Sequence, residues 1–448
     1  MSDRGENLVI CGALRTPFSF GNRLKALRSE VLLGVVLAEL LKKYRLDPKT
    51  IDMIAAGSVQ QDTKAPNVAR IASLQAGFGQ ETNAYSIQAN CNSGFVGLLT
   101  VLGHILSGDA GLGVAAGVES MSNFGFRLND KTGMCSGKAE IEDKLKAGAA
   151  GFLDEFSVVD CLEEGLKDQV NDMAMLEVAE VMAHVYGVTR QEADAYALQN
   201  LARAVRAVEG NRLAGYLVGA GGLAQDNYPL NRKRMLANPA LFSKAPPVFG
   251  PDSEFLNTER FAQKHKKSLD SLGFHGPITP TVTMYNSCIP GDGAGALIVA
   301  EEERALELGL VPRLRVISWA SVGVNPVVMG IGPCEAVHAA FTRPKTRRAQ
   351  GLEMDRMDVI EIHEAFASQA LSVFKESEKK YRRAWNQEKV NVYGGSLAYT
   401  HPLGATNMRL VTDILSRFDE DPAARYAMAC GCAGGGQGTA FVFERYER

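Results

Sequence analysis

Short apolar runs of strand length alternate with helical patterns along the first 120 residues of the chain. Residues 8–14 form a continuous apolar run that Pro17 interrupts, and residues 31–41 then carry a wide apolar face at helical spacing. The alternation continues with strand-like runs at residues 53–56, 84–87 and 111–117, and with a helical pattern at residues 95–106. Strands that alternate with helices predict βαβ units around a largely parallel sheet.

The stretch from about residue 120 to residue 250 is more polar, and its helical patterns are more highly charged. The run Thr189-Arg-Gln-Glu192 is a capping box, which predicts that a helix begins there. Residues 231–234 and 246–247 are typical of exposed loops. We therefore expect an inserted domain at residues 121–250, carried on the α/β body.

The opening pattern returns beyond residue 300. Strand-like runs occupy residues 313–318, 359–362, 426–430 and 439–444, and helical patterns occupy residues 335–341 and 405–418. Although residue identity between the halves is too low to identify a repeat from sequence, the shared order of elements predicts two similar α/β halves. The predicted N-terminal domain comprises residues 1–120 and 251–300, and the predicted C-terminal domain comprises residues 301–448.

Composition places the chain among globular proteins. It has 448 residues, of which 46% are hydrophobic and 22% charged, and 48 basic against 51 acidic side chains leave a net charge of −3. These values exclude disordered, collagen-like and coiled-coil proteins. The lack of a basic block argues against nucleic acid as a partner. Because no long apolar run or secretory segment is found, we expect a cytoplasmic protein with no transmembrane segment.

Cysteine stands out among the residues that carry chemistry. The chain has eight: Cys11, Cys91, Cys135, Cys161, Cys288, Cys334, Cys430 and Cys432. In a large chain without a secretory segment these thiols do not indicate a disulfide framework. The question is therefore which of them react.

Cys91 lies between a strand pattern and an apolar helical pattern, in the run Asn90-Cys-Asn-Ser-Gly94. A cysteine at a helix N-terminus lies at the positive end of the helix dipole, which favours the thiolate. Gly94 allows the close approach that such a turn needs. The pattern favours a nucleophile, and a buried structural thiol is the alternative.

Two histidines follow strand-like runs in the C-terminal half. His363 comes directly after an apolar strand, in Ile362-His-Glu-Ala-Phe-Ala367, where polar side chains are well placed for a site. His401 is followed by proline and then by Gly404, which allows a turn into a helix. A neutral imidazole there is able to accept a thiol proton or polarise a carbonyl group. A hydrogen-bonded structural role is the alternative for each.

Cys432 heads the glycine-rich run Cys-Ala-Gly-Gly-Gly-Gln-Gly438. Consecutive glycines expose backbone N–H groups, so the run is typical of an oxyanion hole. A phosphate loop is a weak alternative, because the run lacks a Gly-Lys-Ser/Thr ending. A zinc site is also weakly supported, because Cys430 and Cys432 have Cys-x-Cys spacing and no Cys-x-x-Cys pair exists.

Taken together, these segments resemble the thiolase family, and they occur in that family's order over essentially the whole chain. The segments are Asn90 to Gly94, Gly117 to Ser122, Tyr186 to Asp194, Asn286 to Gly293, His363 to Ala367, Gly394 to Thr406 and Cys432 to Gly438. The resemblance implies duplicated βαβαβαββ halves that form a five-layer αβαβα body with an inserted loop domain. It also implies an acetyl-CoA C-acyltransferase.

Within the family, histidine in His363-Glu-Ala-Phe replaces the more familiar asparagine. In this respect the chain resembles the 3-ketoacyl-CoA thiolases that serve as β-subunits of fatty-acid-oxidation trifunctional enzymes. Four positions depart from the common pattern and bear on substrate size and coenzyme A contacts: Asn92, Cys288, Thr400 and Asn407. Cys288 stands where serine or threonine often contacts coenzyme A, and with the adjacent Ser287 it is predicted to bind substrate.

The resemblance implies a role for each candidate residue. Cys91 attacks a 3-ketoacyl-CoA, His401 accepts its proton, and Cys432 protonates the acetyl-CoA enolate. His363 and His401 form one oxyanion hole, and the backbone N–H groups of Cys91 and Gly434 form the other. We also expect that glycines 394–395 and 434–436 leave room for the thioester. Coenzyme A is a substrate, and no metal or redox cofactor is implied.

The expected reaction is thiolytic cleavage in fatty-acid β-oxidation. The alternatives are a biosynthetic acetoacetyl-CoA thiolase, a decarboxylating ketosynthase, and a non-catalytic acyl-CoA-binding or scaffold subunit. A ketosynthase normally uses two histidines, and Cys432 would then have no clear role. The resemblance further implies a homodimer or tetramer, and pairing with a hydratase–dehydrogenase α-subunit where the trifunctional assembly exists.

Overall fold

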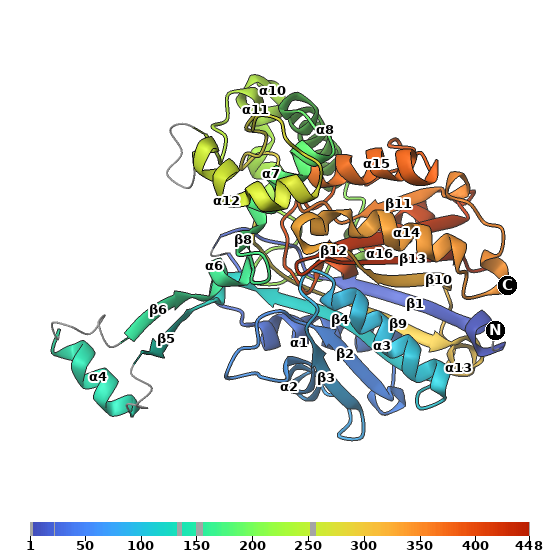
Figure 1. The fold of residues 1–448 in the computed structure, drawn as a ribbon. Helices are drawn as coiled ribbons and strands as arrows, with labels where there is room; N and C mark the ends of the chain where they lie inside the picture. The colour runs from blue at the N-terminus through green and yellow to red at the C-terminus, as the bar shows by residue number, and fades with distance from the viewer. Residues whose placement is uncertain (1–2, 22, 132–136, 149–155, 251–256, 448) are drawn as a thin grey trace.

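The computed structural model describes residues 3–447 except for residue 22 and residues 132–136, 149–155 and 251–256. Cys135 and the predicted boundary at residue 251 lie outside the described residues. Short 3-10 helices occur at Asp3–Asn7, Pro48–Thr50, Met121–Asn123, Ala214–Tyr216, Pro326–Ile331, Arg347–Ala349 and Met354–Arg356. The other elements form two α/β halves and an insertion (Figure 1).

The N-terminal half is a five-stranded sheet in the order β3-β2-β4-β9-β1. Its strands are β1 (Leu8–Arg15), β2 (Met53–Gly57), β3 (Asn83–Ile87), β4 (Leu112–Ser120) and β9 (Asp292–Glu301). Its helices are α1 (Ser29–Tyr44), α2 (Val68–Gln75), α3 (Ser93–Ser107) and α13 (Glu302–Glu307). Strand β2 pairs in parallel with β3 and β4, whereas β9 runs antiparallel to β4 and β1. The prediction of a largely parallel sheet is therefore wrong, because β9 runs antiparallel to both of its neighbours and the last strand of the C-terminal half does the same.

The C-terminal half repeats this arrangement. Its strands are β10 (Leu314–Gly323), β11 (Val359–Ile362), β12 (Tyr426–Ala433) and β13 (Gln437–Arg445), in the order β11-β12-β13-β10. Its helices are α14 (Gly332–Thr342), α15 (Ala367–Tyr381) and α16 (Thr406–Glu420). Val390 forms a parallel bridge with Ile360 and so takes the place of β3 at the sheet edge. Both halves thus have the connection βαβαβαββ, and the predicted duplication is confirmed.

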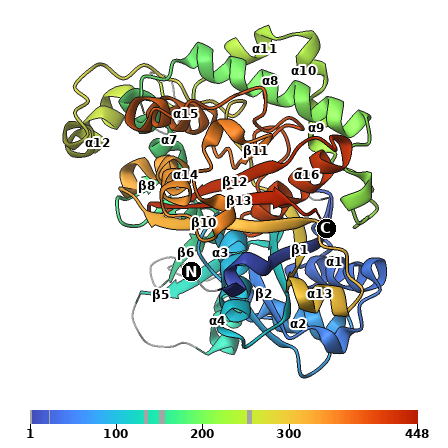
Figure 2. The same ribbon diagram turned by 90° about the vertical axis from the view of Figure 1, so that its right-hand side faces the viewer.

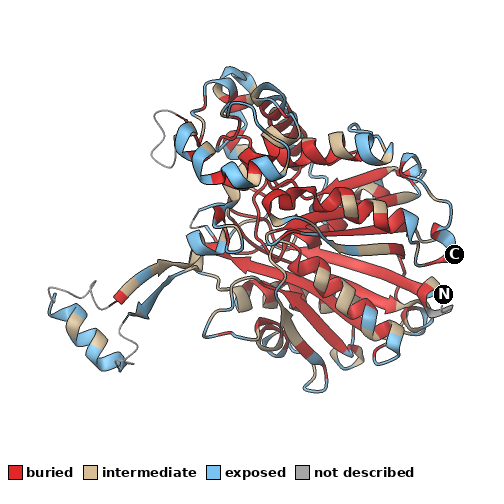
Figure 3. Ribbon diagram, viewed as in Figure 1, coloured by how far each residue is buried: buried red, intermediate tan, exposed pale blue. Residues whose placement is uncertain are grey.

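The two half-sheets meet at one edge, where β1 pairs with β10 through Val9 with Arg315 and Ile10 with Leu314. Helices α3 and α16 pack between the half-sheets, as their shared apolar cluster shows. Helices α1 and α2 cover the outer face of one half-sheet, and α14 and α15 cover the outer face of the other (Figure 2). The expected five layers are therefore present, with buried strands and central helices (Figure 3).

The insertion follows β4. Its helices are α4 (Lys138–Lys146), α6 (Cys161–Gly165), α7 (Met175–Val185), α8 (Arg190–Glu209), α9 (Tyr228–Arg232), α10 (Arg234–Ala237), α11 (Ala240–Ser243) and α12 (Thr258–Ser271). Its strands are the antiparallel pairs β5 (Phe126–Asp130) with β6 (Phe156–Asp160) and β7 (Lys167–Asp168) with β8 (Met173–Ala174). The segment β5-α4-β6 projects from the body (Figure 1).

The predicted capping box begins α8, since the Thr189 hydroxyl accepts from the Glu192 N–H at 3.2 Å and a Glu192 carboxylate oxygen accepts from the Thr189 N–H at 2.7 Å. Helix α12 packs with α7, where the His265 ring is 3.0 Å from the Glu177 carboxylate. Because α12 lies in the predicted N-terminal range 251–300, we propose that the inserted domain extends through residue 271. In the described part of the chain, no helix is long and apolar enough to cross a bilayer.

Candidate active site

The four predicted catalytic side chains lie where secondary-structure elements begin or end. Cys91 is in the turn between β3 and α3, His363 directly follows β11, His401 precedes α16, and Cys432 is near the end of β12. The sulfur of Cys91 and a ring nitrogen of each histidine lie within 4.8 Å of one another. The two imidazole ring centroids are 4.0 Å apart. The structure therefore brings side chains from both halves of the chain into one site.

The Cys91 turn is held against the glycine turn that joins β12 to β13. Asn90 adopts a left-handed backbone conformation with φ of 49°, and its side-chain N–H donates to the Gly434 carbonyl oxygen at 2.8 Å. The backbone N–H groups of Gly434 and Cys91 lie near enough to the Cys91 sulfur to lower the pKa of its thiol. Two N–H groups that lie close to a nucleophile are also close to the oxyanion that forms beside it.

His401 is oriented by Thr406. The Thr406 hydroxyl oxygen lies 3.0 Å from the Pro402 carbonyl oxygen and 2.6 Å from Nδ1 of His401, so we assign its hydrogen to the carbonyl and its lone pair to an N–H at Nδ1. This places the ring proton of His401 on Nδ1 and leaves the Nε2 lone pair available. Among the described residues, Nε2 of His401 is buried without a hydrogen-bond partner. His401 is therefore built as a proton acceptor.

His363 has a similar environment. Its Nδ1 lies 2.9 Å from the Ser396 hydroxyl oxygen. Its Nε2 is also buried and has no partner among the residues that the structure describes. Each imidazole is thus anchored through Nδ1 and has Nε2 free for a reacting group.

Burial keeps this site uncharged before substrate binds. It raises the pKa of the Cys91 thiol to about 11, which outweighs the two backbone N–H groups that favour the thiolate. Burial, together with the Arg409 guanidinium, lowers the pKa of His401 to about 3. The expectation that the helix N-terminus makes Cys91 a thiolate is therefore wrong for the free protein. The resting pair is a thiol beside a neutral imidazole.

The low pKa of His401 predicts a pH-dependent stability. Between the ordinary value of 6.5 and about 3, the unfolded chain binds a proton at this imidazole and the folded chain does not, so stability falls as the pH falls. For His401→Gln, the loss of unfolding free energy between about pH 7 and about pH 5.5 should be about 1 kcal/mol smaller than for the wild type. Urea denaturation at the two pH values measures this difference.

His275 offers a matched control, because its imidazole is exposed on the segment that follows α12. His275→Gln makes the same substitution at this exposed position and should change the pH dependence less than His401→Gln does. An unchanged pH dependence in His401→Gln would contradict the buried neutral imidazole.

The structure also reveals a supporting carboxyl group that sequence reasoning missed. Glu364 is fully buried and accepts hydrogen bonds from the Tyr196 hydroxyl at 2.7 Å, from the Asn200 amide at 2.6 Å and from the Asn391 amide. It thereby ties α8 of the inserted domain to the segment that carries His363. Glu364 lies within the His363 to Ala367 segment that resembles the family, and Tyr196 and Asn200 lie one turn apart on a predicted helix, but neither signal indicates that these residues meet.

Glycines 394 and 395 allow close packing where α8 meets the segment that carries His363. A Cβ atom on Gly394 would lie 2.5 Å from the Ala204 Cβ, and one on Gly395 would lie 2.0 Å from a Glu364 carboxylate oxygen. The expectation that they leave room for a thioester is therefore wrong, because their missing side chains make room for α8 and Glu364. A Cβ atom on Gly434 would meet nothing closer than 3.6 Å.

Glu119, at the end of β4, supports the site from the N-terminal half. Its buried carboxyl group accepts from the N–H groups of Val59 at 3.0 Å, Gln60 at 3.1 Å and Gly404 at 3.0 Å. Burial raises its pKa to about 7. Through Gly404, Glu119 fixes the turn that carries His401. It lies within one of the segments that resemble the family, but its type alone does not indicate this role.

The two residues predicted to bind substrate, Cys288 and Ser287, differ in where their side chains are placed. Burial raises the pKa of the Cys288 thiol well above its ordinary value, and the Cys91 and Cys432 thiols raise it further. The backbone N–H of Cys288 donates to the Ala365 carbonyl oxygen at 2.9 Å. Ser287 is buried, and its hydroxyl donates to the Thr283 carbonyl oxygen at 2.7 Å. The side chain of Cys288 is therefore in the site, whereas that of Ser287 supports the loop.

Three positions that depart from the family pattern lie behind the site. Asn92 and Asn407 are fully buried on either side of Gly431, and the Asn407 side-chain oxygen accepts from the Phe95 N–H at 3.2 Å. Thr400 is also fully buried and packs against Gly291. Asn92 and Asn407 thus contact β12 and α3, and the effect of the three substitutions on the space for substrate stays a prediction.

The three clustered donor atoms of Cys91, His363 and His401 are also types that bind zinc. The two N–H groups near the Cys91 sulfur instead suit a sulfur that reacts with a carbonyl group. We therefore keep the expectation that this cluster works without a metal ion.

Comparisons with known proteins agree with this geometry. The chain matches family models described as "Thiolase, N-terminal domain" over residues 8–218 and "Thiolase, C-terminal domain" over residues 310–445. It is 31% identical to an acetyl-CoA acetyltransferase of Syntrophomonas wolfei, with 98% of each chain covered. It is 33% identical to a beta-ketoadipyl-CoA thiolase of Escherichia coli, covering 97% of this chain and 98% of the relative. The crystal structure of human mitochondrial 3-ketoacyl-CoA thiolase in complex with CoA matches with a TM-score of 0.80 at 27% identity, over 98% of each chain.

Proposed function

Since the chain belongs to the thiolase family, whose members transfer acyl groups to and from coenzyme A, we propose that it cleaves 3-ketoacyl-CoA with free CoA. The products are acetyl-CoA and a shortened acyl-CoA, and the reverse reaction is a Claisen condensation. The observation that carries the proposal is the Cys91 thiol beside the neutral His401, whose free Nε2 is available for the thiol proton.

In the proposed first step, the Cys91 proton passes to Nε2 of His401 and the sulfur attacks the 3-keto carbon. The oxyanion is held by the backbone N–H groups of Cys91 and Gly434. Cleavage of the bond between C2 and C3 leaves the acyl group on Cys91. The acetyl-CoA enolate is stabilised at its oxygen by His363 and takes a proton at carbon from Cys432.

In the second step, the Cys432 thiolate takes the proton of the CoA thiol, and the CoA sulfur attacks the acyl group on Cys91. Cys91 leaves and recovers its proton from His401, so every group returns to its starting state. We propose that Cys288 contacts the CoA part of the substrate, since it lies beside both reacting cysteines. Ser287 supports the loop that carries it.

We propose that the chain acts in fatty-acid β-oxidation. Its substrates would then be 3-ketoacyl-CoA and CoA, as the family resemblance implies. The named relatives differ in substrate, since one is an acetyl-CoA acetyltransferase and another a beta-ketoadipyl-CoA thiolase. A biosynthetic acetoacetyl-CoA thiolase is therefore the second candidate. A homodimer or tetramer, a hydratase–dehydrogenase partner and a cytoplasmic location remain predictions from the resemblance.

Steady-state kinetics with acetoacetyl-CoA and longer 3-ketoacyl-CoAs test the proposal. We expect CoA-dependent turnover with ping-pong kinetics and acetyl-CoA as a product, because the acyl-enzyme forms before CoA attacks. For a β-oxidation enzyme, kcat/KM should be at least as high for a longer chain as for acetoacetyl-CoA. Turnover confined to acetoacetyl-CoA would support the biosynthetic candidate, and a requirement for malonyl substrate would support a ketosynthase. Absence of turnover would overturn the proposal.

A further inference from the structure

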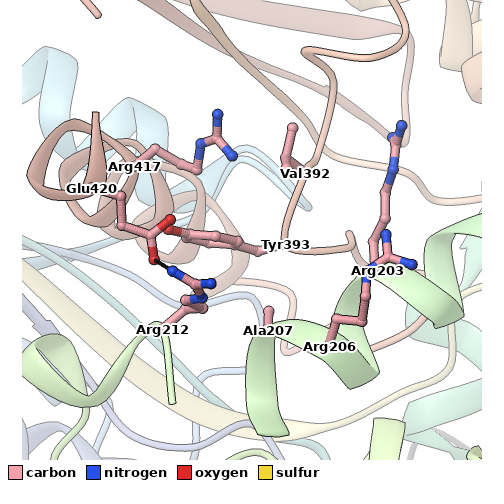
Figure 4. Close-up of a pocket in the computed structure, with 8 residues that line it drawn as sticks. All are labelled: Arg203, Arg206, Ala207, Arg212, Val392, Tyr393, Arg417 and Glu420. Carbon is pink, nitrogen blue, oxygen red and sulfur yellow. Dashed lines mark hydrogen bonds and ion pairs between the residues drawn. The ribbon is translucent and has the colours of Figure 1, made fainter. Parts of the chain in front are cut away.

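A hollow rich in arginine lies at the C-terminal end of α16, away from the candidate active site (Figure 4). Its volume is about 210 Å³. It is lined by Arg203, Arg206, Ala207, Arg212, Val392, Tyr393, Arg417 and Glu420. These residues come from α8, from the segment after it, from the chain beside the Val390 bridge, and from α16. Four guanidinium groups therefore share a hollow with a single carboxylate.

Two of the four arginines already have partners. Arg212 pairs with the Glu420 carboxylate at 3.0 Å. Arg203 is largely buried, and it donates to the Val390 carbonyl oxygen at 2.7 Å and the Gln387 carbonyl oxygen at 3.2 Å. It also lies 3.5 Å from the carboxylate of Glu388, which is highly exposed. These contacts hold the wall of the hollow in place.

Arg206 and Arg417 differ from this pair. Within the described residues, neither guanidinium group has a hydrogen bond or ion pair to a carboxylate or carbonyl group. Arg417 lies over the ring of Tyr393, with its guanidinium carbon 5.5 Å from the ring centroid, and its Nε is buried without an acceptor. Glu420 binds Arg212 and Glu388 lies beside Arg203. The exposed Arg206 and the half-buried Arg417, by contrast, keep N–H donors that an anion in the hollow could use.

The hollow is separate from the path of the thioester. Arg417 follows Thr406 by eleven residues on α16, so the two lie about 17 Å apart along the helix axis. Arg409, on a turn between them, is fully buried and lies over the Tyr399 ring, with 5.5 Å between the guanidinium carbon and the ring centroid. Packed protein therefore separates the arginine hollow from His401.

We propose that this hollow binds a phosphate-bearing anion of about the size of diphosphate. Guanidinium groups present paired donors that match phosphate oxygens, and Arg is the preferred residue for such recognition. Sites for drug-sized ligands have volumes of about 300 Å³ or more, so this one suits a small anion or the phosphates of a nucleotide whose base stays outside. Arg206 and Arg417 supply the free donors, and Arg203 and Arg212 add positive charge.

Calorimetric titration of the purified full-length protein with inorganic diphosphate at low ionic strength tests the proposal. We expect one site per chain in the wild type. In the double variant Arg206→Gln and Arg417→Gln, affinity should fall on the order of 100-fold, about tenfold for each charged donor removed. The control Arg234→Gln removes an exposed arginine outside the hollow, and should bind as the wild type does.

Parallel titrations with inorganic phosphate and with ADP identify the source of the phosphate. Tighter binding of ADP than of diphosphate would assign the site to a nucleotide, and tighter binding of diphosphate would assign it to the free anion. The double variant should melt no lower than the wild type without ligand, because like-charge repulsion is relieved. Absence of binding in the wild type, or equal affinity in the double variant, would overturn the proposal whatever the thiolase activity is.

Discussion

Replacing Cys91 with alanine should lower kcat for thiolysis of acetoacetyl-CoA by on the order of 10⁴- to 10⁶-fold and abolish the acyl-enzyme. The loss is large because, among the thiols that the structure describes, Cys91 is the one whose sulfur clusters with the ring nitrogens of His363 and His401. Steady-state turnover and the intact mass of protein mixed with acyl-CoA measure the two effects. A Cys91→Ala enzyme that turns over acetoacetyl-CoA at the normal rate would refute the assignment.

Cys161→Ala is the matched control for this experiment. Cys161 is a half-buried thiol at the start of α6, in the inserted segment, and has no assigned chemistry. It should retain wild-type turnover and acylation. The melting temperature of Cys91→Ala should stay close to that of the wild type, which would separate a chemical defect from a folding defect.

Replacing Cys432 with alanine should leave Cys91 able to take an acyl group from acyl-CoA but should impair the cleavage and formation of carbon–carbon bonds. The expected loss in turnover is about 10²- to 10⁴-fold, the usual contribution of a general acid or base. Intact-mass measurement of the trapped protein should show one acyl group, and digestion should locate it on Cys91. Burial raises the pKa of Cys432 well above its ordinary value, so it holds a proton ready for the enolate.

The control for Cys432 lies on the same strand. Cys430 is also fully buried on β12, two residues earlier, and its replacement by alanine removes a sulfur of equal size. Cys430→Ala should keep near wild-type turnover. If Cys432→Ala retained full turnover, or if acylation occurred on a residue other than Cys91, the division of roles between the two thiols would be wrong.

The sequence predicts the candidate site well because each site residue lies in a short motif that can be recognised from its immediate neighbours in the chain. Cys91, His363 and His401 each follow a strand pattern and precede a helical pattern, and such junctions meet at the carboxyl edge of a sheet. The duplicated order of elements is predictable for the same reason. The antiparallel direction of β9 and β13 is not, because a strand pattern does not show which strands it will pair with or in which direction.

What the sequence does not predict depends on contacts between distant segments. The hydrogen bonds of Glu364 to Tyr196 and Asn200 join residues more than 160 positions apart. The sequence predicts that other groups pack closely against glycines 394 and 395. It does not predict that these groups are Ala204 and Glu364. The pKa of Cys91 illustrates the same limit, because the helix N-terminus is visible in the sequence while the burial that outweighs it is not.

Neither half of the chain contains a complete catalyst. Cys91 and His401 occupy equivalent turns, one before α3 and the other before α16, and the two helices pack together between the half-sheets. If these turns belonged to two copies of one short chain, a substitution that introduced a thiol at one would introduce it at both. Joining the halves in a single polypeptide lets each turn vary independently, so that one turn can carry the proposed nucleophile and the other its proposed base.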